Sequence, residues 1–165
     1  MTALEHAPTD DVLVEAQLGR PVRGEWAVAR RCHLGIPMVI ESHPRLDGDA
    51  PFPTLFWLTC PVLGKRASAL ESQGWMEPLS GRLATEPALK ERLAGALARY
   101  RARRDAHAPI PESGGPPGGG PDRVKCLHAH VAHELADPPN AVGALVLAVV
   151  GWPDCAAPCF EVDPS

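Results

Sequence analysis

The stretch PFPTLFWLTCP, residues 51–61, marks the point where the chain changes from strand patterns to helix patterns. Its centre, Thr54–Thr59, is β-branched and aromatic, which is typical of a strand. After Pro61 the apolar residues Val62, Ala69 and Leu70 follow a helical spacing that ends at Gly74. We therefore predict that the last strand of a sheet lies at 54–59 and that helices follow it.

Upstream of this stretch the sequence predicts two further strands and one short helix. Alternating apolar residues predict a strand over Val22–Cys32, and Met38–Ile40 predicts a second strand after a turn. The segment His43–Pro53 is rich in proline and aspartate, so we expect a loop there. A short helix, capped by Asp10 or Asp11, is expected to end near Leu18.

Downstream, helical periodicity predicts helices over about Glu86–His107 and Arg123–Ala136. Residues 108–122 hold five glycines and five prolines, which predicts a flexible surface loop. Val142–Val150 is apolar throughout, so its periodicity fits a buried strand as well as a short core helix.

A chain of 165 residues is expected to form one domain. We predict an α+β fold, with a sheet of about three strands followed by helices packed on one of its faces. The domain is expected to span residues 11–152, with a loose tail at 1–10 and another at 153–165.

The bulk composition argues against several classes of partner. A net charge of −4 and a pI near 5.9 give no overall field that would attract nucleic acid or an anionic membrane. The N-terminus lacks the basic start and apolar run of a secretory signal. The longest apolar stretch, 141–152, has about 12 residues, whereas a membrane-spanning helix needs about 20. We therefore expect a cytoplasmic protein with no membrane span.

Five cysteines in a chain without an export signal favour free thiols, a metal site or a catalytic cysteine over structural disulfides. The segment VKCLHAHVAHELA, residues 124–136, is the most informative. On a helix, Cys126, His130 and His133 lie within about 60° of one another. His128 points to the opposite side, so either the helix begins after Leu127 or His128 has a different role.

Zinc binds thiolate and imidazole together, so this helix face predicts a zinc-type site made by Cys126, His130 and His133. The fourth ligand would come from elsewhere in the chain: Cys60, Cys32, Cys155 or Cys159. If water keeps the fourth position instead, Glu134 would serve as a general base in hydrolysis. The structural alternative is a buried Cys126 with histidines that pack or face solvent.

Two other cysteine arrangements point to chemistry. Cys155 and Cys159 are spaced C-x3-C, which zinc-binding turns tolerate. Cys60 lies between the predicted strand and a helix, where a helix dipole favours the thiolate. With a nearby histidine, Cys60 would be a candidate nucleophile; otherwise it is a buried cysteine at the end of the sheet. The basic end of the long helix, Arg99–Arg104, is a solvated face or a docking surface for a protein partner.

Several segments together resemble the bacterial, mostly actinobacterial, domain of unknown function 501 family. They are RRCHLGIPMVIESHP (30–44), PFPTLFWLTCP (51–61), LESQG (70–74) and VKCLHAHVAHELA (124–136), with Asn140, Val142 and Gly143. The resemblance covers about residues 12–150 and implies no substrate. It places Cys60, Cys126, His128 and His130 in the signature segments, and it implies a loose association with envelope or division functions.

Three hypotheses follow. The first is a protein with a zinc-type site at Cys60, Cys126, His130 and His133, either structural or hydrolytic. The second is a non-enzymatic interaction protein, associated with cell division or the envelope. The third is a cysteine-dependent enzyme that uses Cys60 with His128 or His130. Whether the protein is an enzyme stays open at this stage.

Overall fold

The computed structural model describes residues 3–111 and 115–162 of the chain. Three strands, β1 (Trp26–Arg31), β2 (Pro37–Ser42) and β3 (Phe56–Leu58), form an antiparallel sheet in the order β1-β2-β3. All three lie where the sequence predicted strands, with shorter bounds for the first and the last. Because side chains alternate along a strand, the paired residues Val39 and Leu58 face one side of the sheet, and Ile40 and Trp57 face the other.

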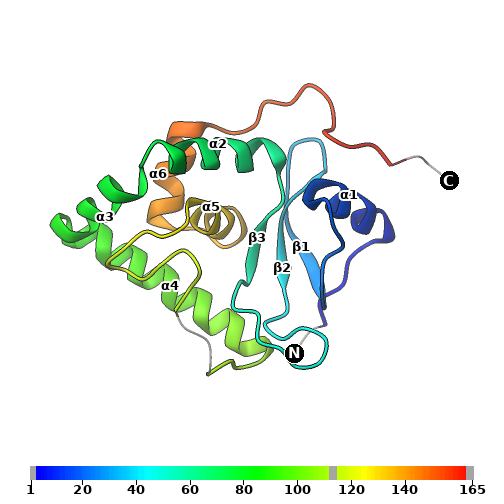
Figure 1. Cartoon of the computed structure of the whole chain (residues 1–165), viewed down its shortest axis with the longest axis horizontal. Helices are drawn as coiled ribbons and strands as arrows, with labels where there is room; N and C mark the ends of the chain where they lie inside the picture. The colour runs from blue at the N-terminus through cyan, green and yellow to red at the C-terminus, as the bar shows by residue number, and fades with distance from the viewer. Residues whose placement is uncertain (1–2, 112–114, 163–165) are drawn as a thin grey trace.

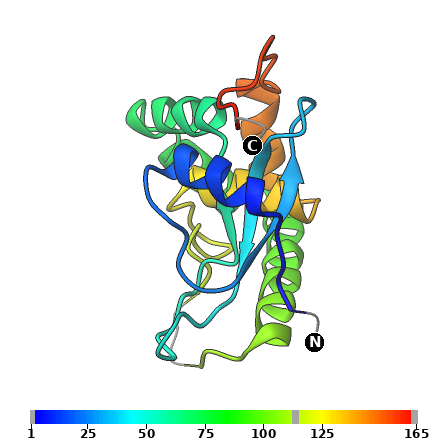
Figure 2. The ribbon, with the colours of Figure 1, turned by 90° about the vertical axis from the view of Figure 1, so that its right-hand side faces the viewer.

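The five helices that follow the sheet lie on the side of Val39 and build the main core (Figure 1). They are α2 (Pro61–Ser72), α3 (Met76–Thr85), α4 (Pro87–His107), α5 (Leu127–Ala136) and α6 (Ala141–Val150). Helix α5 is central, since it packs against both β3 and α6. Helix α1 (Pro8–Leu18) covers the opposite face, where Val14 packs with Trp26 and Ile40. Figure 2 shows α1 crossing in front of the sheet. The predicted α+β fold is confirmed.

The helix α3 was not predicted. Its segment contains Pro78 and Gly81, which are the weakest helix formers. Pro78 is tolerated because it falls in the first turn, where its missing N–H has no helical partner to bond. The burial of Leu79 and Leu83, four residues apart, then holds the helix against the core.

The open assignment of 142–150 resolves to the helix α6. The side chain of Asn140 caps this helix by accepting a hydrogen bond from the N–H of Gly143 at 2.9 Å. A β-carbon on Gly143 would lie 2.2 Å from the carbonyl oxygen of His130, so glycine is what allows α6 to cross α5 this closely.

The described parts of 108–122 have neither helix nor strand, as predicted, but they do not lie wholly on the surface. Ile110 is buried, and the carbonyl of Gly118 lies 2.8 Å from Nε2 of His130. The loop therefore covers one end of α5. The N-terminal helix also begins earlier than expected, at Pro8, with Asp10 in its first turn bonded to the N–H of Ala7.

Candidate functional site

The site forms where α5 begins beside α2. Cys126 has an extended backbone, with φ −151°, and α5 begins at the next residue. Glu71 near the end of α2 accepts a hydrogen bond from the N–H of Leu127 at 2.7 Å, which satisfies one of the free donors at the start of α5. The predicted helix start at residue 123 is therefore wrong. Since Cys126 precedes the helix, it does not share a helical face with His130 and His133.

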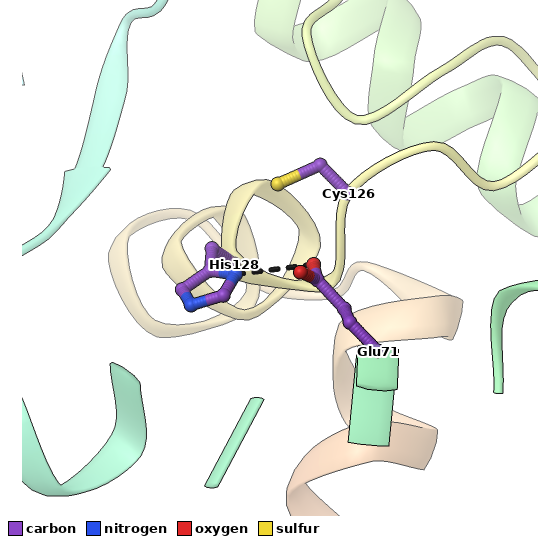
Figure 3. A group of neighbouring side chains, drawn as sticks. All are labelled: Glu71, Cys126 and His128. Atoms are coloured by element: carbon purple, nitrogen blue, oxygen red, sulfur yellow. Dashed lines mark hydrogen bonds and ion pairs between the residues drawn. The ribbon is translucent and has the colours of Figure 1, made fainter. Parts of the chain in front are cut away.

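Glu71, Cys126 and His128 instead form a cluster. One ligand atom from each, a carboxylate oxygen, the sulfur and a ring nitrogen, lies within 4.8 Å of the other two. Within the ranges that the structure describes, no other set of three His, Cys, Asp or Glu side chains comes this close. Figure 3 shows the Nδ1 edge of His128 turned toward both the carboxylate and the sulfur. The distance from Nδ1 to Oε1 of Glu71 is 3.1 Å.

The other ring nitrogen of His128 is fixed by α2. Its Nε2 lies 3.1 Å from the carbonyl oxygen of Gly64 and 3.1 Å from Oγ of Ser68. A carbonyl oxygen only accepts hydrogen bonds, so Nε2 carries a hydrogen. Hydrogen bonding to Cys126 and to the Glu71 carboxylate raises the pKa of His128 to about 9, although partial burial opposes this shift. The cluster thus favours positive charge at Nδ1.

The cluster borders an open pocket of about 340 Å³. Cys126 and His128 are two of its polar side chains, and most of the remaining wall is apolar. The lining residues are Thr54, Phe56, Trp57, Leu58, Pro117, Cys126, His128 and Ala129. A small molecule in this pocket would therefore reach the thiol and the imidazole from an apolar environment.

His130 and His133, two predicted metal ligands, lie instead in the buried core. The side-chain nitrogen of Asn140 lies 3.2 Å from Nδ1 of His130 and 3.0 Å from Nδ1 of His133. His133 packs between the rings of Phe56 and Tyr100. Burial lowers the pKa of both histidines, that of His133 to about 4. In this structure the two imidazoles are neutral groups of the core.

Glu134 and Cys60 also differ from their predicted surroundings. The carboxylate of Glu134 accepts a hydrogen bond from the N–H of Asn140, so it fastens the α5–α6 corner rather than facing the cluster. Cys60 is buried at the N-terminus of α2, and this burial raises the pKa of its thiol. His128 lies with Cys126, and the ring nitrogens of His130 face Gly118 and Asn140, so the predicted pairing of Cys60 with His128 or His130 is not formed. Cys60 lines a separate small pocket with three other cysteines: Cys32, Cys155 and Cys159.

The basic end of α4 is largely engaged within the chain. Arg99 donates to the carbonyl oxygens of Asp137 and Pro139. Arg103 forms two hydrogen bonds with the buried carboxylate of Glu41. The side chain of Arg104 is buried and donates to Asp105. Three of these arginines therefore stabilise the fold. Fewer unbonded guanidinium groups are left at Arg99–Arg104 for the predicted docking of a protein partner.

Glu71 is the site residue that sequence reasoning missed. It lies in the segment LESQG, which carried part of the family resemblance. Glu71 is neither a cysteine nor a histidine, and it reaches the site from 55 positions before Cys126 in the chain. A carboxylate inside a signature segment was the available signal.

Comparison with known proteins gives one match. A family model described as "Protein of unknown function (DUF501)" matches residues 28–148, a span that includes all three residues of the cluster. No curated protein and no solved structure matches the chain. Among the described residues, no helix is both long enough and apolar enough to cross a membrane.

Proposed function

Since the chain belongs to the DUF501 family, whose description names no activity, we propose a function from its own side chains. The protein binds a divalent zinc-type ion through Glu71, Cys126 and His128. The convergence of a carboxylate, a thiol and an imidazole on one point carries this proposal. It keeps the zinc-type site expected from the sequence, but of the four expected ligands it retains only Cys126 and adds Glu71 and His128.

The donor set and its support suit zinc. Zinc binds Cys sulfur, His nitrogen and carboxylate oxygen. A histidine ligand usually donates its other N–H to a carbonyl or carboxylate, which fixes its tautomer. The carbonyl of Gly64 is the matching partner for Nε2 of His128, and it leaves Nδ1 free for an ion once that nitrogen loses its proton.

The same geometry argues against a thiol enzyme of the Cys–His–carboxylate type. In such a site the thiol and the orienting carboxylate lie on opposite ring nitrogens of the histidine. Here Cys126 and Glu71 both face the Nδ1 edge, and Nε2 is bound to the main chain (Figure 3).

Three protein ligands leave one position of a tetrahedral ion open, which is typical of catalytic rather than structural zinc. When bound, zinc in such a site lowers the pKa of a coordinated water and so supplies a nucleophile for hydrolysis. In this chain the open position would face the pocket beside Trp57 and Leu58. The apolar wall would then admit a substrate with an apolar group next to its hydrolysed bond.

The test is the zinc content of the purified protein and of three variants, measured by elemental analysis after purification without chelator. Glu71→Gln removes the charge but retains an oxygen that accepts from the N–H of Leu127. His128→Ala removes the imidazole. Glu91→Gln, at an exposed position of α4, is the matched control.

The wild type and Glu91→Gln are expected to carry the same zinc content, and Glu71→Gln and His128→Ala one equivalent less per chain. Circular dichroism checks that all four proteins are folded. An equal zinc content in all four would contradict the proposal.

A further inference from the structure

The face of the sheet opposite the main core is only partly covered by α1. Side chains alternate along a strand, so Ile40 and Ser42 of β2 lie on the same face as Trp57 of β3. Helix α1 packs Val14 against Trp26 and Ile40. In Figure 2 the chain between α1 and β1 also passes in front of the sheet. Loops rather than a helix therefore cover the area around Ser42 and Trp57.

A pocket of about 370 Å³ lies in this area, and we call it the α1 pocket. Its volume is within the range of about 300–1,000 Å³ that is typical of small-molecule sites. The polar side chains in its wall are Arg20, Arg23 and Ser42. The other side chains are apolar: Leu18, Val22, Ile40, Leu46, Phe52 and Trp57. An apolar wall with a few polar groups is the usual composition of a ligand site.

The walls of the α1 pocket are held in place by contacts within the chain. Gly24 has a φ of +73°, and a β-carbon there would lie 3.2 Å from Cδ2 of Leu46. Glycine therefore lets the segment after α1 lie against the loop that carries Leu46. The N–H of Phe52 donates to the carbonyl of Pro44 at 2.7 Å, and the Phe52 ring stacks on Trp57 with 5.8 Å between ring centres. A ligand would not have to order these walls.

Two arginines line the pocket without a carboxylate partner. The guanidinium carbon of Arg20 lies 5.7 Å from the centre of the Trp57 ring. Within residues 3–111 and 115–162, no acidic side chain pairs with Arg20 or Arg23, whereas Arg31 and Arg103 each bind a carboxylate. The described lining also includes no acidic residue. The pocket is thus locally positive, although the whole chain has a net charge of −4.

Ser42 is the buried polar group of the pocket. It is 2% exposed, and no residue in the described part of the chain hydrogen-bonds its hydroxyl. A hydroxyl that is buried in this way needs a hydrogen-bond partner. Since Ser42 lines the pocket, a polar atom of a bound molecule would supply that partner.

We propose that the α1 pocket binds a small molecule in which an aromatic ring carries an anionic group. The ring packs against the apolar wall beside Phe52 and Trp57. Arg20 and Arg23 pair with the anionic group, and Ser42 hydrogen-bonds the bound molecule. Carboxylate and phosphate both fit a guanidinium fork, so the negative charge next to the ring is the recognised feature.

This proposal goes beyond the metal site and does not depend on it. None of the ligands Glu71, Cys126 and His128 lines the α1 pocket. Trp57 lines both this pocket and the one beside the cluster, so Trp57 is left unchanged in the test.

The test is calorimetric titration of the protein with naphthoate, naphthyl phosphate and the neutral naphthylmethanol. Chelator is present throughout, so that anion binding to a metal ion does not contribute. At least one of the two anionic compounds is expected to bind with a dissociation constant below about 1 mM. Naphthylmethanol is expected to bind about tenfold more weakly or less, because it lacks the charge. Comparison of the two anions identifies the preferred anionic group.

Three variants locate the binding. Arg20→Gln/Arg23→Gln is expected to weaken binding of the anion about tenfold or more, because two charged partners are lost. Ser42→Ala is expected to weaken it about two- to tenfold. The matched control Lys65→Gln/Arg92→Gln removes the same charge from exposed positions of α2 and α4, and it is expected to bind like the wild type. Circular dichroism checks that every variant is folded.

Three results would overturn this proposal. The first is that neither anionic compound binds the wild type. The second is equal affinity in Arg20→Gln/Arg23→Gln and its control. The third is loss of binding in His128→Ala, because that would place the compound in the pocket beside the cluster. Retained binding in His128→Ala is expected, so failure of the metal site and failure of the α1 pocket are recognised separately.

Discussion

Acidification from pH 7 to pH 5 is expected to destabilise the protein through His133. This imidazole is buried between Phe56 and Tyr100, its Nδ1 faces the amide of Asn140, and its Nε2 has no hydrogen-bond partner. Desolvation lowers its pKa from 6.5 to about 4. Between pH 4 and pH 6.5, the His133 imidazole is protonated in the unfolded chain but not in the folded chain. The stability contributed by neutral His133 is therefore present above pH 6.5 and is lost as the pH falls toward 4.

The size of the effect follows from the shift. At pH 5 the unfolded imidazole is almost fully protonated, and linkage gives a loss of about 2 kcal/mol in the free energy of unfolding relative to pH 7. Below pH 4 the loss in the free energy of unfolding reaches its limit of about 3 kcal/mol. The pH range from 7 to 5 is chosen because it lies above the usual pKa of the carboxyl groups, which dominate acid unfolding at lower pH.

The assay is urea unfolding at pH 7 and pH 5 with chelator present, for the wild type and for His133→Leu. The substitution lowers stability at both pH values because it removes one of the two histidine partners of the Asn140 side chain. The quantity that matters is the change with pH, which is expected to be about 2 kcal/mol smaller in the variant. The same pH dependence in both proteins would refute the assignment of His133 as a buried neutral group.

Four other perturbations have expected outcomes. Gly143→Ala is expected to cost about 1–3 kcal/mol or more in a urea titration, because its β-carbon would collide with the backbone of α5. Gly95→Ala, at an open position of α4, is expected to gain about 0.5–1 kcal/mol, and a loss there would contradict this comparison. Tyr100→Phe is expected to lower the free energy of unfolding by about 1–3 kcal/mol, because the N–H of Leu55 donates to the Tyr100 hydroxyl at 2.6 Å. The same substitution is expected to speed amide exchange at Leu55. Unchanged exchange would argue against this bond. In the metal-free protein, stability is expected to fall as the pH rises from 6.5 to 9, because the pKa of His128 is raised to about 9 in the folded chain. Unfolding curves are measured for the wild type and His128→Ala. The same fall in the variant would exclude His128 as its origin.

The sheet and most helices could be predicted because their patterns are local. The apolar and aromatic run Thr54–Thr59 predicts β3, and the spacing of leucines predicts α4. The helix α6 was ambiguous since it is apolar on every side, and the cap at Asn140 decides it. The missed helix α3 contains a proline and a glycine, and its stability comes from burial against the core rather than from propensity.

The candidate site could be predicted only in part. Cys126 and His128 belong to a segment that the sequence marks as chemically rich, but their mutual geometry depends on where α5 begins. The start of α5 is fixed by a hydrogen bond from the N–H of Leu127 to the carboxylate of Glu71. This is a tertiary contact between residues far apart in the chain. Periodicity does not report such a contact, so helical spacing predicted that Cys126 lies beside His130 instead.

The most direct test of the metal site is nitrogen NMR of the histidine rings, with protein labelled with ¹⁵N at histidine and titrated with zinc. His128 is expected to keep a hydrogen on Nε2, bonded to the carbonyl of Gly64, while its Nδ1 resonance moves to the position of a metal-bound nitrogen. Assignment by comparison with His128→Ala identifies the signal. If zinc leaves both ring nitrogens of His128 unchanged, then Glu71, Cys126 and His128 do not form a metal site.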